Sequence, residues 1–160
     1  MTQTWIHLYI PGKPGYVFSS SLPGDPVKSL EKALGGVKPN TSGRPRVLVV
    51  DDEKIIADSV ATILNRSGFD AVAKYGGVPA IEFIRQECPD ILLSDVMMPE
   101  LNGVQLAKST FSRCPNTRIV LISGNAATPN LLDHAFSDGS PFELLAKPIH
   151  PSQLLHILKG

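Results

Sequence analysis

The sequence has no excess of charge and no long apolar run. Its 160 residues carry 15 Lys and Arg against 15 Asp and Glu, so the net charge is zero. Bulk charge therefore favours neither nucleic acid nor an anionic membrane as a partner. No apolar run approaches the roughly 20 residues that cross a bilayer, and no basic start followed by an apolar core marks a secretory signal. We expect a cytoplasmic protein without direct membrane or nucleic-acid contact.

Cysteine is also scarce. Only Cys88 and Cys114 are present, and each directly precedes a proline at the end of a helical stretch. Their spacing matches no metal-ligand pattern. Cytosolic proteins usually keep their thiols reduced, so we expect two reduced thiols.

The first 44 residues differ in composition from the rest. They carry five Lys and Arg against two Asp and Glu, a net +3, whereas residues 45–160 carry ten against thirteen, a net −3. Residues 4–10 alternate weakly, as a lone strand would, and residues 25–34 have the pattern of a short helix. We predict that residues 1–44 form a poorly ordered N-terminal extension and that residues 45–160 form one domain.

From Arg46 onward, five short apolar runs alternate with five helical patterns. Short β-branched and leucine-rich runs are typical of buried strands in a parallel sheet. We expect strands near residues 46–51, 69–74, 90–95, 118–123 and 142–146, and helices near 53–67, 77–87, 102–113, 128–137 and 151–159. The first helix has the spacing of a buried apolar stripe, formed by Ile56, Val60, Ile63 and Leu64. The alternation predicts an α/β fold with helices on both faces of the sheet.

Four of these apolar runs end in residues with polar side chains. Asp51 and Asp52 follow the first run, and the third ends in Asp95. The fourth ends in Ser123, and Lys147 follows the fifth. Ligands of open α/β sheets bind at the carboxyl ends of the strands, so we expect these side chains to converge. Any one of them alone would be an ordinary helix cap or a solvated charge; the set together favours a site.

The expected cluster has a definite chemistry. Neighbouring carboxylates repel one another, and this raises their pKa values when no cation is bound. Mg²⁺ relieves that repulsion, because it prefers oxygen ligands and is commonly shared with phosphate oxygens. A carboxylate can also accept a phosphoryl group as an acyl phosphate. A lysine ammonium and a hydroxyl then stabilise the charge of the transferring group.

Residues 46–159 resemble the receiver domain of bacterial two-component response regulators. The matching motifs are Val-Leu-Val-Val-Asp51-Asp52, Ser94-Asp95-Val96-Met97-Met98-Pro99 with Asn102-Gly103, Ile122-Ser123-Gly124 and Lys147-Pro148. The resemblance implies a flavodoxin-like three-layer sandwich, with a five-stranded parallel sheet of order 2-1-3-4-5 and five helices. It also implies a cis peptide bond between Lys147 and Pro148.

The resemblance further implies a role for each site residue. Asp95 would be the phosphoacceptor. Mg²⁺ would be bound by Asp51, Asp52, Asp95 and the backbone carbonyl of Met97. Ser123 would bind the phosphoryl group at the switch position, and Lys147 would pair with Asp95 or its phosphate. Ile55, beside the acidic pocket, is a candidate contact for a kinase.

Two features bear on how such a receiver would pass on its signal. Receivers usually have an aromatic switch residue three positions before the lysine, where this chain has Leu144. The aromatic side chain that usually couples phosphate to an output surface is therefore missing from this position. The chain also shows no output domain after the last helix, so we expect a stand-alone receiver.

The sequence hypothesis is a single-domain response regulator. It would accept a phosphoryl group on Asp95 from a sensor histidine kinase or exchange it with a histidine phosphotransfer protein, and would act through protein contacts. It would not be an enzyme on other substrates, although it would catalyse its own phosphotransfer and dephosphorylation. Two alternatives stay open: a receiver-like module that signals without phosphate, and an aspartate-nucleophile phosphatase. The phosphatase is less favoured, because Met97 stands where such enzymes have a second aspartate.

Overall fold

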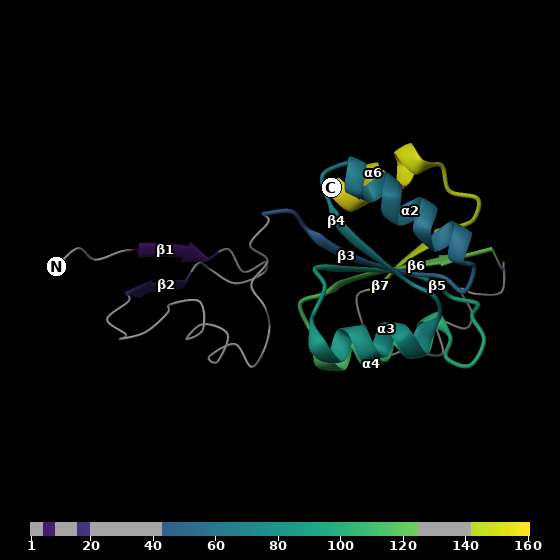
Figure 1. Ribbon diagram of the computed structural model, residues 1–160, viewed down its shortest axis with the longest axis horizontal. Coiled ribbons are helices and arrows are strands. Elements are labelled where there is room, and N and C mark those ends of the chain that lie inside the picture. The colour runs from purple at the N-terminus through teal and green to yellow at the C-terminus, as the bar shows by residue number, and fades with distance from the viewer. Residues whose placement is uncertain (1–4, 9–15, 20–42, 125–141) are drawn as a thin grey trace. The chain divides into compact units, whose positions relative to one another are not determined.

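The computed structural model describes residues 5–8, 16–19, 43–124 and 142–160 (Figure 1). The chain divides into two units, residues 1–39 and 40–160, each of which is described by itself. Within the described part of the chain, no helix is long and apolar enough to cross a membrane.

The larger unit is built on a five-stranded parallel sheet. Its strands are β3 (Arg46–Val50), β4 (Asp70–Lys74), β5 (Ile91–Asp95), β6 (Arg118–Ser123) and β7 (Phe142–Ala146). They lie in the order β4-β3-β5-β6-β7, which is the predicted order 2-1-3-4-5. The central strands are almost wholly buried, as expected for runs covered on both faces. The flavodoxin-like fold class is confirmed.

Helices cover both faces of this sheet (Figure 1). The helices are α2 (Lys54–Arg66), α3 (Gly77–Gln86), α4 (Gly103–Arg113) and α6 (Pro151–Lys159). Buried residues of α2 and α6 form one core cluster with the sheet, and those of α3 and α4 form another. The helix expected near residues 128–137 lies outside the described residues, so four of the five expected helices are seen.

The buried face of α2 differs from the predicted stripe. Leu64 is fully buried, but the residues that share the sheet face with it are Ala57 and Ala61. Ile56, Val60 and Ile63 are only half-buried, so their prediction as core residues is wrong in part. Val60 still packs against the core cluster that contains Ala57, Ala61 and Leu64, as a partly buried residue.

The two cysteines are joined. A disulfide links Cys88 to Cys114, whose Cα atoms lie 5.7 Å apart. The expectation of two reduced thiols is therefore wrong for this structure. The reason lies in the topology: Cys88 follows α3 and Cys114 follows α4, and α3 and α4 pack side by side on the same face of the sheet. Their carboxyl-terminal ends therefore meet although 26 residues separate the cysteines.

The N-terminal segment contains one antiparallel strand pair. β1 (Trp5–Leu8) pairs with β2 (Tyr16–Ser19), with Trp5 opposite Ser19. The weak strand expected over residues 4–10 is thus present in shorter form, with a partner that the sequence pattern did not indicate. The short helix expected within 25–34 lies outside the described residues. The predicted boundary near residue 44 and the predicted poor order of residues 1–44 stay predictions.

Candidate functional site

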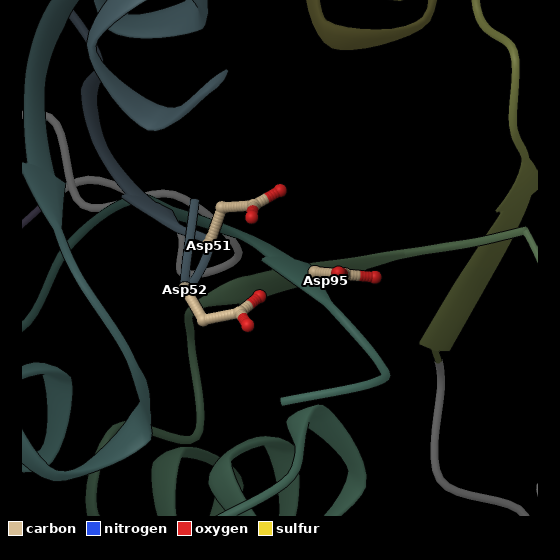
Figure 2. Close-up of side chains that lie close together, drawn as sticks. All are labelled: Asp51, Asp52 and Asp95. Atoms are coloured by element: carbon tan, nitrogen blue, oxygen red, sulfur yellow. The ribbon is translucent and has the colours of Figure 1, made fainter. Parts of the chain in front are cut away.

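The parallel register of the strands brings the predicted polar residues to one edge. Val50 of β3 pairs with Ser94 of β5, and Ser123 of β6 pairs with Ala146 of β7. Asp51 therefore begins the loop after β3, while Asp95 ends β5 and Lys147 follows β7. Figure 2 shows the carboxylates of Asp51, Asp52 and Asp95 directed to the same side of this edge.

The three carboxylates and the lysine form one compact cluster. Carboxylate oxygens of Asp51, Asp52 and Asp95 lie within 4.8 Å of one another. The Nζ atom of Lys147 lies 3.3 Å from Asp95 Oδ2 and 3.5 Å from Asp51 Oδ2. The Asp51 side chain is 6% exposed and that of Asp95 is 10% exposed. The predicted convergence of these four residues is therefore observed.

Burial and neighbouring charges shift the protonation of the cluster. Burial raises the pKa of Asp51 above its ordinary value of 3.8, and the charges of Asp95 and Asp52 act in the same direction. The backbone N–H of Glu53, which donates to Asp51 Oδ1 at 2.9 Å, and the Lys147 ammonium oppose this rise without cancelling it. Ionisation of Asp51 is therefore more costly here than in an exposed aspartate.

The lysine responds in the opposite sense. Burial alone would lower the pKa of Lys147, but the carboxylates of Asp95 and Asp51 raise it above its ordinary value of 10.5. Lys147 is therefore an ammonium at neutral pH. Three carboxylates and one ammonium carry a net charge of −2 when all are ionised, so a divalent cation would neutralise the cluster. The donor set, all oxygen, fits a hard cation such as Mg²⁺.

The chain after Asp95 is held tightly against the sheet. The backbone N–H of Val96 donates to the carbonyl of Ile122, and the N–H of Gly103 donates to the carbonyl of Val96. A Cβ atom on Gly103 would lie 2.2 Å from the Asp95 carbonyl oxygen, so only glycine permits this approach. Asn102 begins α4 with a capping box, in which its side chain accepts from the N–H of Gln105. The start of α4 thus positions the backbone of Asp95.

The remaining predicted residues surround this cluster in different ways. Ser123 is 5% exposed, and its carbonyl accepts a hydrogen bond from the N–H of Lys147 at 2.8 Å. The side chain of Met97 is 54% exposed in the loop after β5. Ile55, at the start of α2, is 82% exposed. The Lys147–Pro148 peptide bond is cis, as the resemblance implied.

Leu144 lies three residues before Lys147, at the position where receivers usually have an aromatic residue. It lies in β7 opposite Leu121 of β6 and is half-buried against the core cluster that includes α3 and α4. The nearest aromatic on this strand, Phe142, packs edge to face against Phe111 of α4, with ring centroids 6.1 Å apart. Phe142 therefore belongs to the packing of the sheet on α4, and Leu144 keeps the switch position aliphatic.

An apolar cavity of about 520 Å³ adjoins the acidic edge. The half-buried side chains of α2 contribute to its wall, together with residues that begin α6. Its lining includes Ile56, Val60, Ile63, Ile149, Pro151 and Leu154, and its polar lining consists of Asp51, Ser94, Asp95 and Lys147. Asp51, whose pKa is raised by burial, thus lies between the acidic edge and this largely apolar cavity.

One polar network near the first turn of α2 was missed at the sequence level. The Tyr75 hydroxyl donates to Asp58 Oδ1 at 2.8 Å, and Lys54 Nζ donates to the Tyr75 hydroxyl at 2.8 Å. Lys54 also pairs with Asp58 at 3.1 Å. The i,i+4 spacing of Lys54 and Asp58 was a readable signal for that pair. Tyr75 joins from the loop after β4, and no local pattern indicates this contact.

Taken together, the fold and the site define a parallel α/β domain with three clustered aspartates that could hold a metal ion, and a lysine paired with two of them, at the carboxyl edge of the sheet. Comparison with known proteins agrees with this class. The family model of the response regulator receiver domain matches residues 47–159. The chain belongs to this family.

Individual relatives match over the same region. The response regulator MprA of Mycobacterium ulcerans (strain Agy99) is 30% identical over 110 residues, which are 69% of this chain and 47% of that protein. The receiver domain of the Francisella response regulator 1452 is 30% identical, with a TM-score of 0.63 over 72% of this chain and 94% of that one. The chemotaxis protein CheY4 of Vibrio cholerae is 26% identical, with a TM-score of 0.65 over 73% and 98%. The chain spans about half, or less, of the length of the curated relatives it matches.

Proposed function

We propose that Asp95 accepts a phosphoryl group from a phosphohistidine of a sensor histidine kinase or a histidine phosphotransfer protein. The observation that carries this proposal is the cluster itself: an acceptor carboxylate lies 3.3 Å from an ammonium and within 4.8 Å of two further carboxylates. Asp51, Asp52, Asp95 and the Met97 carbonyl would hold Mg²⁺, which would neutralise the carboxylates and the oxygens of the transferring group.

The chemical step follows from the position of Asp95. One of its carboxylate oxygens forms a bond to phosphorus while the N–P bond of the donor breaks. The electron pair of that bond returns to the imidazole nitrogen, which takes a proton from solvent. The product is an acyl phosphate, which water hydrolyses slowly to inorganic phosphate and the free carboxylate. The reaction is thus autocatalysed on Asp95 and does not turn over other substrates.

Lys147 and Ser123 would respond to the new phosphate. The Lys147 ammonium is already next to Asp95, so it can pair with the phosphoryl oxygens as charge develops. Ser123 lies at the end of the strand beside Asp95, and its hydroxyl would bind the phosphoryl group. The added negative charge would then shift an equilibrium between an inactive and an active conformation.

The exposed apolar side chain beside the site suggests how the donor docks. Ile55 is 82% exposed at the start of α2, immediately after the loop that bears Asp51 and Asp52. A helical donor domain that covers Ile55 would bring its phosphohistidine to Asp95. We propose a cytoplasmic phosphorelay component whose output consists of protein contacts.

A receiver-like module that signals without phosphate is the second candidate. The observation that favours it is the aliphatic Leu144, because a leucine cannot make the ring rotation and hydroxyl contact of the usual switch. In this alternative the acidic cluster would bind a cation but would not take up phosphate.

One experiment separates these two functions. The full chain is incubated with Mg²⁺ and acetyl phosphate, and its intact mass is measured, alongside Asp95→Ala and the matched variant Asp90→Ala at the opposite edge of the sheet. We expect one phosphate adduct in the wild type and in Asp90→Ala, and none in Asp95→Ala. A folded wild type that binds Mg²⁺ without forming an adduct would exclude the acceptor role. Sustained hydrolysis of unrelated phosphomonoesters would instead indicate a phosphatase.

A further inference from the structure

The disulfide lies at the edge of the sheet opposite the acidic cluster. Cys88 follows α3, and Cys114 is the residue at which α4 ends. Both precede strands, β5 and β6, that carry the chain toward the carboxyl edge. The Cα separation of 5.7 Å falls within the range that disulfides normally occupy. The bond is therefore compatible with the packing of the two helices.

We propose that Cys88 and Cys114 form a reversible redox site that exchanges with thiols and disulfides while the domain stays folded. The proposal rests on the proposed function in one respect, since a phosphorelay acceptor works inside the cell. Disulfides of intracellular proteins are rarely permanent and are usually transient, catalytic or redox-sensing. A disulfide in such a protein thus indicates a reversible couple.

Contacts other than the disulfide hold the two cysteine-bearing loops together. The hydroxyl of Thr117 donates to the carbonyl of Pro89 at 2.7 Å. The guanidinium of Arg113 donates to the carbonyl of Ile84 at 3.1 Å, which ties α4 to the end of α3. The backbone N–H of Arg118 donates to the carbonyl of Asp90 at 2.9 Å. These hydrogen bonds do not require the S–S bond, so the sulfurs remain neighbours after reduction and the bond can close again without refolding.

The two cysteines differ in exposure. Cys114 is 3% exposed, whereas Cys88 is only half-buried. Exchange depends on which sulfur an incoming thiolate can reach. Cys88 is therefore the point of attack, and Cys114 is the leaving group.

The exchange balances with a dithiol as the reductant. A thiolate of the dithiol forms a bond to Cys88 Sγ as the Cys88–Cys114 bond breaks, and Cys114 leaves as a thiolate that takes a proton from solvent. The second thiol of the reductant then attacks its own sulfur in the mixed disulfide. Cys88 is released as a thiol, and the dithiol becomes a disulfide. Two electrons pass to the cysteine pair, and a small disulfide such as oxidised glutathione reverses the process.

The test measures exchange in the folded full chain. The protein is equilibrated with mixtures of reduced and oxidised dithiothreitol without denaturant, quenched with N-ethylmaleimide and weighed, while circular dichroism monitors folding. We expect no maleimide on the oxidised protein, two on the reduced protein, and none again after reoxidation, with an unchanged far-UV spectrum. Reduction should lower the melting temperature by roughly 10 °C, because the bond closes a loop of intermediate length.

Single variants test the direction of attack and the role of the flanking contacts. In Cys114→Ser, the remaining Cys88 should react with maleimide at least about tenfold faster than Cys114 does in Cys88→Ser. Thr117→Val, which lacks the hydroxyl bonded to Pro89, should reoxidise several-fold more slowly, whereas the exposed-residue control Ser112→Ala should match the wild type.

Three outcomes would overturn the proposal. The pair could stay reduced in oxidised dithiothreitol, it could be reducible only in urea that unfolds the domain, or both cysteines could react equally fast. The Asp95 phosphate adduct is measured on the same samples and in the variant with both cysteines replaced by serine. Loss of exchange with retention of the adduct would refute the redox site alone. Loss of the adduct with retention of exchange would refute only the acceptor role.

Discussion

The Nζ atom of Lys147 lies 3.3 Å from a carboxylate oxygen of Asp95 and 3.5 Å from one of Asp51. The Lys147 ammonium thus pairs with the carboxylate of Asp95, at the end of β5, and with that of Asp51, in the loop before α2. It compensates part of the repulsion among the three aspartates.

Replacement of Lys147 by methionine should destabilise the domain without Mg²⁺ and strengthen Mg²⁺ binding. The side chain of Lys147 is 32% exposed and that of its partner Asp95 is 10% exposed. We therefore expect the free energy of unfolding to fall by about 1–2 kcal/mol at neutral pH. Because the pKa of Lys147 is raised, this stabilisation is complete below pH 10.5 and is lost as pH rises through the folded-state pKa. Removal of a cation beside the metal site should improve Mg²⁺ affinity roughly tenfold.

Urea unfolding with and without Mg²⁺ measures both effects. Lys54→Met is the matched control, since it removes the same charge from a lysine that is 66% exposed and pairs with Asp58 away from the cluster. Equal Mg²⁺ affinity in the two variants would show that Lys147 does not act on the metal site.

Without Mg²⁺, Asp51 should contribute an increasing destabilisation of the folded state as pH rises above 3.8. Burial raises the folded-state pKa of Asp51, so the folded protein retains a proton that the unfolded chain has lost. This loss of folding stability is absent below pH 3.8 and reaches its full size above the raised folded-state pKa of Asp51. Asp51→Asn should therefore be more stable than the wild type at neutral pH in chelator, and this advantage should vanish toward pH 3.8.

Saturating Mg²⁺ should reverse that order, because the cation stabilises the wild type by mass action and binds the variant less tightly. Denaturant midpoints at several pH values, with chelator or with Mg²⁺, provide the measurement. A stability of Asp51→Asn that follows the wild type at every pH would contradict the assignment of the penalty to Asp51.

Replacement of Gly103 by alanine should disturb the acceptor, whereas replacement of Gly124 should not disturb the fold. A Cβ on Gly103 would lie 2.2 Å from the Asp95 carbonyl oxygen, so the start of α4 must move. We expect a loss of roughly 1–3 kcal/mol and a reduced yield of the Asp95 adduct. A Cβ on Gly124 would meet only Lys147 Cβ, at 3.8 Å, which is an ordinary contact.

Thermal unfolding and intact mass after acetyl phosphate treatment compare these two alanine variants. If Gly103→Ala formed the adduct as fully as Gly124→Ala, the close packing of α4 on Asp95 would have no part in positioning the acceptor.

Replacement of Ile55 by serine should impair transfer from a protein donor but not from a small donor. The side chain is 82% exposed and contributes little to the core, so stability should change by less than about 0.5 kcal/mol. Phosphorylation by acetyl phosphate should equal that of the wild type, whereas transfer from a phosphorylated histidine phosphotransfer domain should slow several-fold. Ser59→Ala, an exposed change on the same helix, serves as the control. An equal slowing with both donors would place Ile55 in the chemistry and not in docking.

Much of the fold was predictable because its signals are local. The five apolar runs end within a residue or two of the strands observed, and the described helices begin and end near the predicted bounds. The errors concern faces. Ile56, Val60 and Ile63 have the spacing of a buried stripe but are only half-buried, whereas Ala57 and Ala61 are buried in the core cluster on the sheet. Helical periodicity shows which side of a helix is apolar. It does not show that small residues on that side are among those buried most deeply.

Some features of the site could be predicted from local sequence, and others could not. Asp51, Asp52, Asp95, Ser123 and Lys147 were identifiable because each follows or ends an apolar run, and parallel strands bring such ends together. The contact of Tyr75 with Asp58 and the disulfide between Cys88 and Cys114 were not identifiable. Each joins residues from different loops, and the distance between two loops depends on how the helices pack on the sheet.

The succession of strands and helices and the residue types at the carboxyl edge could thus be predicted from the chain alone, since run length and periodicity are properties of neighbouring residues. Three other properties became known only from the packed domain: the Lys147 ammonium reaches both Asp51 and Asp95, burial raises the pKa of Asp51, and the two cysteines are bonded. Those properties depend on distances and solvent exclusion between segments far apart in the chain, which exist only once the helices have packed on the sheet.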